Sequence, residues 1–360
     1  MFLRRLPCSV FTGLTLVLSF SLAVPPSASA KATLPQPPAF TLQDLGPLPF
    51  IADEVLPGLS DTGEVSFWQN QAQAVQGAVW SQGQTQMLGG MTGYSSQMTH
   101  DINAHGEIAG WTSTSANSVD SRAVTRGCLW RGNVLTLLGT LGGRNSQAFG
   151  INSQSIVVGV AQCADGARHA FLAKNTILRD LGTLPGGTFS QAYAINTAGH
   201  TVGVSNSTLP YKHAVCWRDG QVHDLGLLPG GATSSAQAIN ARDQIAGYAD
   251  TPDGTHAFLY TQGKMQDLGT LGEAPSSAAA LNDQGQVVGT SGFAADQDHA
   301  FLWQKGVLFD LNKLVAPGSP WVLLRACAIN NHGQIVCVGH RKNDQTAHIL
   351  FLTPVSAHAK

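Results

Sequence analysis

The sequence is poor in charged residues and lacks the common short signatures of enzymes. Asp, Glu, Lys and Arg make up 12% of the chain, about half of the usual share, and the formal net charge at pH 7 is only −2. This balance argues against a nucleic-acid partner, which would require a basic patch. The chain contains no G-x-S-x-G, H-E-x-x-H, Walker or CxxC sequence, so neither a cofactor nor a metal site is predicted.

We predict no membrane span in the mature chain that remains after removal of the signal peptide. The first 30 residues have the pattern of a bacterial-type secretory signal peptide. Arg4 and Arg5 precede an apolar run from Phe11 to Val24, and Ala28-Ser29-Ala30 is a small-residue cleavage site. The alternative is a membrane anchor, but this apolar run is too short to span a bilayer. We therefore predict a secreted or periplasmic protein.

Cysteine is scarce, with five residues left after the signal peptide. An exported protein meets oxidising conditions, and Cys327 and Cys337 flank a predicted hairpin turn, so these two could form a disulfide. Cross-strand geometry often disfavours such a bond, and unpaired thiols are the alternative. Because the number is odd, one thiol must stay free or pair elsewhere.

Glycine, in contrast, is abundant, with 40 residues, and the sequence is repetitive. A leucine in a DLG-like step recurs at intervals of 43 to 50 residues. The seven anchors are Leu45, Leu88, Leu138, Leu181, Leu225, Leu268 and Leu311. We predict seven structural units over residues 39–354, preceded by a Pro-rich lead-in at 31–38 and followed by a tail at 355–360.

Each unit contains four short segments that are typical of β-strands. In the unit after Leu181 these are Ser190–Asn196, His200–Ser205, His213–Trp217 and Gln221–Gly226. Asn196 and Gly199 between the first two predict a tight turn, because the short Asn side chain bonds its own backbone and glycine accepts a positive φ. Four strands in about 43 residues, repeated seven times, predict an all-β, seven-bladed β-propeller.

The chain ends predict that the ring closes on itself. The last unit ends with a third strand at His348–Pro354, and the first ordered segment, Ala39–Gly46, resembles a fourth strand. Together the two fragments complete one blade. We therefore expect the N-terminal strand to pair with the C-terminal one.

The repeats resemble the HAF family of probable extracellular repeats, which is named for a tripeptide found here three times. It occurs at His169-Ala170-Phe171, His256-Ala257-Phe258 and His299-Ala300-Phe301. The resemblance covers residues from about Ala39 to Pro354 and implies an extracellular repeat protein, but it implies no reaction. Units one and two depart most from the pattern, with Gln76 and Arg126 in place of the histidine.

A histidine and an aspartate recur together in most units. The pairs are His169/Asp180, His213/Asp224, His256/Asp267 and His299/Asp310, each 11 residues apart, and the ring-closing arrangement adds His348/Asp44. Positions at this spacing lie opposite or nearly so on neighbouring strands, and a buried imidazole needs an acceptor for its N–H. Five sites spread round a ring cannot converge on one substrate, so we interpret them as structural braces rather than as catalytic or metal-binding groups.

The loops that vary between units are where we expect a ligand. The longest is Thr112–Gly127, and Asn312–Ala326 is also extended. Exposed aromatic residues beside arginine suit a sugar or peptide site, although ordinary packing is the alternative for each one. The candidates are Tyr94, Trp111, Arg144, Phe189, Tyr211, Trp321 and Arg341.

These features predict a secreted scaffold that binds a carbohydrate or protein surface through its loop-rich face, without catalysis. The alternative is a polysaccharide lyase or hydrolase with its site at the mouth of the central channel. An enzyme should gather carboxylates, histidine or arginine near the channel, whereas a binding module should present aromatic residues without such a cluster.

Overall fold

The computed structural model describes residues 37–48, 56–71, 74–115, 122–208, 211–272, 275–294 and 297–355. The predicted signal peptide, most of the lead-in and the tail beyond Val355 lie outside the described residues. Among the described residues, no helix is both long and apolar enough to cross a bilayer.

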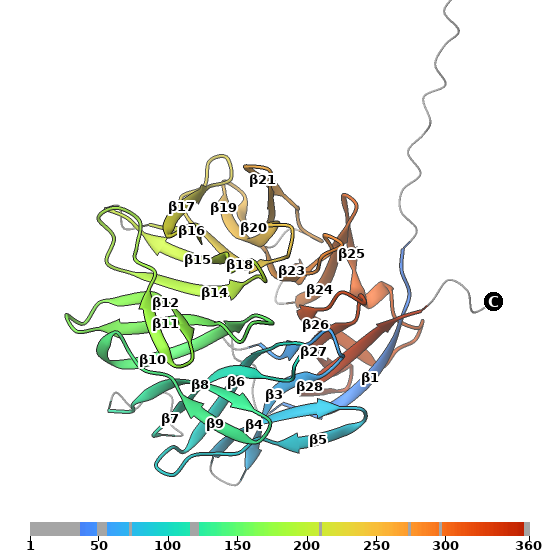
Figure 1. Cartoon of the computed structure of the whole chain (residues 1–360). Coiled ribbons are helices and arrows are strands. Elements are labelled where there is room, and N and C mark those ends of the chain that lie inside the picture. The colour runs from blue at the N-terminus through green and yellow to red at the C-terminus, as the bar shows by residue number, and fades with distance from the viewer. Residues whose placement is uncertain are drawn as a thin grey trace, which may run out of the picture. The chain divides into compact units, whose positions relative to one another are not determined.

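Seven four-stranded antiparallel sheets form a ring of blades, which confirms the predicted seven-bladed propeller (Figure 1). Blade 1 contains β2 (Gly58–Leu59), β3 (Val65–Gln71), β4 (Ala74–Ser81) and β5 (Gln84–Met87). Blade 2 contains β6 (Ser96–Ile102), β7 (Ile108–Ser113), β8 (Thr125–Arg131) and β9 (Val134–Leu137). Blade 3 contains β10 (Gly142–Ile151), β11 (Val157–Cys163), β12 (Arg168–Lys174) and β13 (Ile177–Asp180).

The remaining blades follow the same order of strands. Blade 4 contains β14 (Ser190–Ile195), β15 (Thr201–Asn206), β16 (Lys212–Arg218) and β17 (Gln221–Gly226). Blade 5 contains β18 (Ser234–Ile239), β19 (Ile245–Thr251), β20 (Gly254–Thr261) and β21 (Lys264–Asp267). Blade 6 contains β22 (Ser276–Leu281), β23 (Val287–Ala294), β24 (Gln297–Gln304) and β25 (Val307–Asp310). Blade 7 contains β26 (Trp321–Ile329), β27 (Ile335–Arg341), β28 (Asp344–Pro354) and β1 (Phe40–Pro47).

The N-terminal strand closes the ring, as the sequence predicts. β1 pairs with β28 in an antiparallel register that runs from Phe40 opposite Pro354 to Pro47 opposite His348. Phe40 and Leu45 of β1 are both buried, each in a different apolar cluster. Strand β1 therefore supplies core side chains as well as hydrogen bonds to the last blade.

Stacking of the blades buries both faces of the middle strands. In β16 the four residues from Ala214 to Trp217 are all buried, so the strand does not alternate between apolar and polar positions. The phenylalanines of the HAF tripeptides, Phe171, Phe258 and Phe301, are fully buried. Phe171 packs against Ala109 and other residues of the preceding blade. Since truncation of such a buried phenylalanine typically costs about 3–5 kcal/mol, these residues stabilise the contact between blades.

The turn between the first and second strands has the predicted chemistry. The Asn196 side-chain oxygen accepts hydrogen bonds from the backbone N–H of Ala198 and His200, at 3.1 and 3.0 Å, and Gly199 has a φ of +85°. In the two turns that lack this glycine, Ser155 and Asp243 adopt the left-handed conformation instead, with φ of +57° and +58°. The hydrogen bonds of the asparagine side chain therefore hold the turn even where its fourth residue is not glycine.

Cys327 and Cys337 do not form the possible disulfide, and the alternative of unpaired thiols describes them. Both thiols are free and buried. Cys337 lies opposite Ala326, so Cys327 is one position out of register and the two side chains pack in different apolar clusters. Because successive side chains in a strand point to opposite faces, a hairpin pair offset by one residue cannot be bridged.

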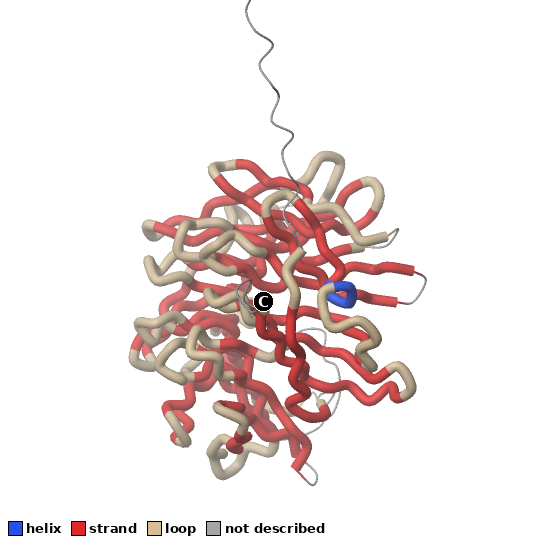
Figure 2. The backbone as a smooth tube through the Cα atoms, turned by 90° about the vertical axis from the view of Figure 1, so that its right-hand side faces the viewer, coloured by secondary structure: helices blue, strands red, loops and turns tan. Residues whose placement is uncertain are grey.

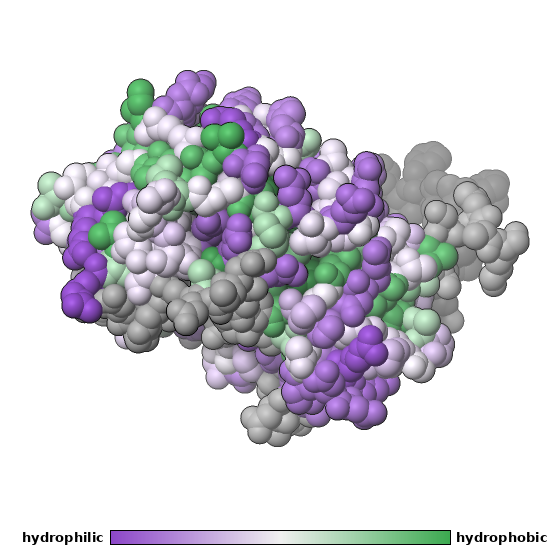
Figure 3. All heavy atoms as spheres, turned by 90° about the horizontal axis from the view of Figure 1, so that it is seen from below, coloured by the Kyte–Doolittle hydropathy of each residue, from purple (hydrophilic) through white to green (hydrophobic). Residues whose placement is uncertain are grey.

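Nearly all of the described backbone outside the turns is strand, and the exception is one turn of 3-10 helix, η1 (Leu311–Lys313) (Figure 2). On the face seen in Figure 3, hydrophilic and apolar residues are intermixed rather than segregated. That face does not point to a single charged or apolar partner.

Candidate ligand-binding site

The two ends of the propeller carry different connections. Because the strands of a blade alternate in direction, turns from first to second and from third to fourth strand lie at one end. Hairpins from second to third strand and links to the next blade lie at the other end, which we call the loop-rich face. The extended segment 312–320 between β25 and β26 is one of these links.

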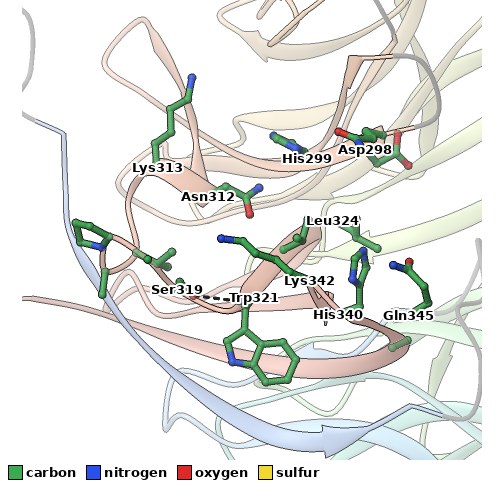
Figure 4. Close-up of a pocket in the computed structure, with 17 residues that line it drawn as sticks. Asp298, His299, Asn312, Lys313, Ser319, Trp321, Leu324, His340, Lys342 and Gln345 are labelled. Atoms are coloured by element: carbon green, nitrogen blue, oxygen red, sulfur yellow. Dashed lines mark hydrogen bonds between the residues drawn. The ribbon is translucent and has the colours of Figure 1, made fainter.

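A pocket of about 920 Å³ opens on the loop-rich face between blades 6 and 7 (Figure 4). Its polar and aromatic lining includes Asp298, His299, Asn312, Lys313, Ser319, Trp321, His340, Lys342 and Gln345. The volume falls in the range of pockets that hold small ligands. The structure therefore places a recess beside the extended link in which the sequence predicts one ligand residue, Trp321.

A departure from the repeat motif builds the pocket wall. Here the DLG step reads Asp310-Leu311-Asn312, and the Asp310 carboxylate accepts from the Asn312 N–H at 2.9 Å, which caps η1. The Asn312 side chain then donates to the Leu323 carbonyl at 2.9 Å and accepts from the Leu323 N–H at 2.8 Å. These two bonds clamp the base of the link, so the segment between them projects as a fixed wall.

Trp321 lines the pocket but is 8% exposed. The Arg341 guanidinium lies 4.8 Å from the centre of the Trp321 ring, and the His348 ring centre lies 5.0 Å from it. The structure thus brings Trp321 and Arg341 together, as a site with an aromatic beside an arginine requires. The expectation that Trp321 is exposed is wrong, because its ring is packed into the wall and little of it is left for stacking on a ligand.

The pocket carries more positive than negative fixed charge. Lys313 and Lys342 contribute ammonium groups, and Asp298 is the carboxylate among the described lining residues. Figure 4 shows the Lys342 side chain extending across the recess toward Asn312. Lysine with neighbouring amides and a hydroxyl favours a ligand that carries an acidic group together with hydroxyls.

Trp321 is the one predicted ligand residue in the described lining of this pocket, because Arg341 contacts the Trp321 ring without lining the recess. Tyr94, Arg144, Phe189 and Tyr211 lie at blades 2, 3 and 4, and Trp111 belongs to strand β7. The placement of Trp111 in a loop is wrong, because its side chain packs against the apolar cluster between blades 7, 1 and 2. Phe189 lies under the Lys212 ammonium, which is 4.4 Å from the ring centre, and Tyr211 is 51% exposed.

All five predicted histidine–aspartate pairs are hydrogen-bonded. The distance from the imidazole Nδ1 to the carboxylate is 2.8 Å in blades 3, 4 and 5, 3.1 Å in blade 6 and 2.9 Å in blade 7. The pairs are diagonal rather than directly opposite, since Asp180 faces Phe171 while His169 lies two residues away. The expected burial is only partial: His256 is 17% and Asp267 42% exposed, and Asp310 alone is nearly buried at 3%.

The brace extends beyond the pair and explains the repeated motif. In blade 4 the second Asp224 oxygen accepts from the Gly226 N–H at 2.8 Å, which fixes the turn that leaves the blade. Ser234 of the next blade then accepts from the Ala214 N–H and donates to the Gly226 carbonyl, at 2.8 and 2.7 Å. In blades 3, 4 and 5, histidine, aspartate, glycine and serine thus tie the third strand to the following blade.

The central channel forms a second cavity of about 400 Å³. In several blades a β-bulge in the first strand turns the side chain of one residue toward the channel. A glycine on the second strand leaves room for the bulge, because a Cβ on Gly203 would lie 2.0 Å from the Gln191 carbonyl oxygen. The bulge positions that line the channel are His100, Phe149, Tyr193, Gln237, Ala279 and Cys327. The sequence pattern does not reveal this set, because a bulge breaks the alternation of side chains along a strand.

An arc of rings covers one side of the channel. His100 contacts Phe149 edge-on with ring centres 5.1 Å apart, and Phe149 contacts Tyr193 at 5.8 Å. Asp101 is the carboxylate among the described lining residues, and burial raises its pKa to about 6, although the N–H groups of Ile151 and Ile102 bond to it and lower it. Both Asp101 oxygens are therefore engaged with the backbone.

At the end opposite the loop-rich face, six buried asparagines form an inter-blade chain, the asparagine ring. Its members are Asn103, Asn152, Asn196, Asn240, Asn282 and Asn330. Each side-chain amide donates to the backbone carbonyl at the equivalent position of the next blade, at 3.0–3.1 Å, and Asn330 donates to Ser60. Sequence reasoning assigned these residues only a local turn, whereas they also join the blades.

The comparisons with known proteins agree on the fold. No protein-family model matches the chain, and no curated protein matches it. A puromycin hydrolase mutant is similar over 86% of this chain and 56% of its own, with 12% identity and a TM-score of 0.56. The β-propeller domain of the Trilobed protease from Pyrococcus furiosus matches 85% of this chain and 99% of its own, with 10% identity and a TM-score of 0.53. A chain of the mitotic checkpoint complex matches 94% of this chain and all of its own, with 14% identity and a TM-score of 0.51. At these identities the likeness establishes a β-propeller and nothing finer.

Proposed function

We propose that this protein is a binding scaffold whose ligand enters the pocket between blades 6 and 7, and that the ligand is a carbohydrate carrying acidic groups. The observation that carries the proposal is the recess of about 920 Å³ whose lining combines the ammonium groups of Lys313 and Lys342 with side-chain amides and the Ser319 hydroxyl. Carboxylate or sulfate groups would pair with the lysines, and sugar hydroxyls would bond Asn312 and Gln345.

The clamped link supports this role. Asn312 fixes the base of the link through its two bonds to Leu323, so the wall is held in place before a ligand arrives. Binding then orders few side chains, which limits its entropic cost. The proposal includes export through the N-terminal signal pattern and kinship with the HAF extracellular repeats, since both would place the pocket where polysaccharides occur.

A glycan array probed with the mature chain, residues 31–360, tests the proposal. We expect binding to acidic glycans, lost by at least roughly tenfold in Lys342→Glu, because the substitution reverses a charge inside the pocket. The matched control is Lys264→Glu, which changes an exposed lysine at a turn on the opposite end and should leave binding unchanged. Equal binding by both variants would contradict the assignment of the pocket.

A protein array and a polysaccharide digestion panel resolve the alternatives. Binding to acidic protein segments, with the same loss in Lys342→Glu, would replace the carbohydrate by a protein ligand at the same site. Polysaccharide cleavage that is lost in His100→Ala but retained in Lys342→Glu would instead establish a lyase or hydrolase with its site at the channel.

A further inference from the structure

One brace differs from the other four by a cysteine beside it. In blade 3, ligand atoms of Cys163, His169 and Asp180 all lie within 4.8 Å of one another. The thiol, the imidazole and the carboxylate come from three adjacent strands, β11, β12 and β13. Cys163 is also the half-buried member of the five described cysteines, while the other four are buried in the core.

The backbone holds Cys163 at this position. Its N–H donates to the Ala167 carbonyl at 2.8 Å, and its carbonyl accepts from the Gly166 N–H at 3.1 Å, which closes a tight hairpin. On the other side it pairs with Gly142 of β10. The thiol is thus presented to the brace by a fixed turn rather than by a free loop, and the 21% exposed His169 and 43% exposed Asp180 leave a path from solvent.

We propose that Cys163, His169 and Asp180 form a binding site for a thiophilic divalent transition-metal ion such as Zn²⁺. Zn²⁺ is bound by thiolate at about 2.3 Å and by imidazole and carboxylate at about 2.0–2.2 Å, which puts neighbouring ligand atoms roughly 3.3–3.6 Å apart. The His169 Nδ1 to Asp180 distance is 2.8 Å, and the thiol needs to approach by only about 1 Å. The fourth position is left for water.

The equivalent position of blade 7 already holds a cation next to its brace. Cys163 lies two residues after Ala161, which pairs with His169, and Arg341 lies two residues after Gly339, which pairs with His348. The Arg341 guanidinium is 4.0 Å from the Asp44 carboxylate. This part of the fold can therefore hold a positive charge beside the His–Asp pair. In blade 3 the Cys163 thiol stands where blade 7 has the Arg341 guanidinium.

Binding of the ion releases one net proton from the protein to solvent. The Cys163 thiol releases its proton to solvent and binds as the thiolate, and His169 moves its proton from Nδ1 to Nε2 so that the Nδ1 lone pair faces the ion. Asp180 already serves as an acceptor. Burial raises the pKa of the Cys163 thiol, and the negative charge of Asp180 and Asp165 raises it further; the same charge attracts a divalent cation.

Cobalt provides the test, because Co²⁺ occupies Zn²⁺ sites and its bond to a thiolate gives a charge-transfer band in the near ultraviolet. The reduced mature chain, freed of any polyhistidine tag, is titrated with Co²⁺ and then with Zn²⁺. We expect one Co²⁺ per chain, displacement by Zn²⁺, and loss of the band in Cys163→Ser, which keeps the size of the side chain and the brace.

Two further variants separate the site from general stability. His213→Ala breaks the same brace in blade 4, where no cysteine adjoins it, and should leave Co²⁺ binding unchanged. Asp180→Asn should weaken binding at least roughly tenfold. Absence of the band in the unmodified chain, its persistence in Cys163→Ser, or full affinity in Asp180→Asn would each overturn the site. Glycan binding plays no part in these measurements, so the result is independent of the proposed function.

Discussion

Blades 4 and 5 follow the repeat closely, whereas blades 1 and 2 keep the fold without its most visible motif. In blades 4 and 5 a histidine on the third strand bonds an aspartate on the fourth. In blade 1 Gln76 takes the place of the histidine and donates to the Leu88 carbonyl at 2.7 Å. In blade 2 Arg126 donates to the carbonyls of Thr125 and Arg144. Different side chains on the third strand can therefore fill this position, provided that they donate a hydrogen bond to a neighbouring carbonyl or carboxylate.

Some structural features are shared by all seven blades and others are not. Every blade has four strands and stacks on its neighbours, but five blades carry a His–Asp pair and six contribute to the asparagine ring. Stability should then depend most on closure and stacking, less on the asparagines and least on the braces. The following measurements test that order.

The largest effect is expected from opening the ring. A chain that starts at Pro49 lacks β1, and with it Phe40, Leu45 and the Asp44 partner of His348. Losing three buried side chains (Leu48 is removed as well) and a strand of hydrogen bonds should lower the free energy of unfolding by at least about 5 kcal/mol. Urea denaturation measures it. A chain that starts at Pro37 is the control, and equal midpoints for the two chains would mean that closure contributes little.

The asparagine ring should come next. Asn196→Ala removes two bonds that its oxygen accepts and two that its amide donates, to the Asn240 carbonyl and the Asp243 carboxylate. Because buried partners are left unpaired, we expect a loss of about 3 kcal/mol. Ser60→Ala, at the blade 1 position, should cost about 1 kcal/mol, since Ser60 bonds only within its own turn through its side chain among the described residues. Similar losses would remove the distinction between the two blades.

Blade 2 should show a pH dependence of its own through Asp101. Burial raises the folded-state pKa of Asp101 from 3.8 to about 6, so the folded chain binds a proton more tightly than the unfolded chain does. This contribution to stability is present below about pH 4 and is lost as the pH rises to about 6, by up to about 3 kcal/mol. Thermal unfolding from pH 4 to 7 should show a smaller fall for Asp101→Asn than for the unmodified chain. Parallel curves would contradict the raised pKa.

The smallest effect is expected for a single brace. His256→Ala should lower the thermal midpoint, and a double-mutant cycle with Asp267→Ala should give a coupling energy of about 1 kcal/mol, since the pair is charge-assisted but the carboxylate is 42% exposed. Additive single effects would show that the pair is not an energetic unit. Gln76→Ala in blade 1 should cost a similar amount through its bond to the Leu88 carbonyl.

The repeat made the architecture predictable, because spacing and turn chemistry are local properties of the sequence. The interval between DLG steps gave the number of blades, and the strand fragments at the two ends gave the closure between β1 and β28. The braces followed from co-occurrence of two residue types. Their diagonal geometry did not, since register depends on the bulges and turns between strands.

The site was harder to predict because it depends on departures from the repeat. The sequence places Trp321 on the link that borders the pocket, but the clamp between Asn312 and Leu323 joins residues with no recurring pattern. Trp111 was misplaced because a polar neighbourhood in the sequence hides a strand that packs against the preceding blade. Whether the two cysteines can form a disulfide depends on the direction of their side chains. Cys337 pairs with Ala326, so Cys327 is offset from it by one residue.

The closing strand has a consequence for the order in which the molecule can be assembled. Thr41 and Thr353 are partners although 312 positions separate them along the chain. At a synthesis rate of about 5–20 residues per second, β1 emerges from the ribosome roughly 15–60 seconds before its partner exists. Blade 7 is therefore the last part of the protein to be completed, and a polypeptide truncated before β28 can never take that step.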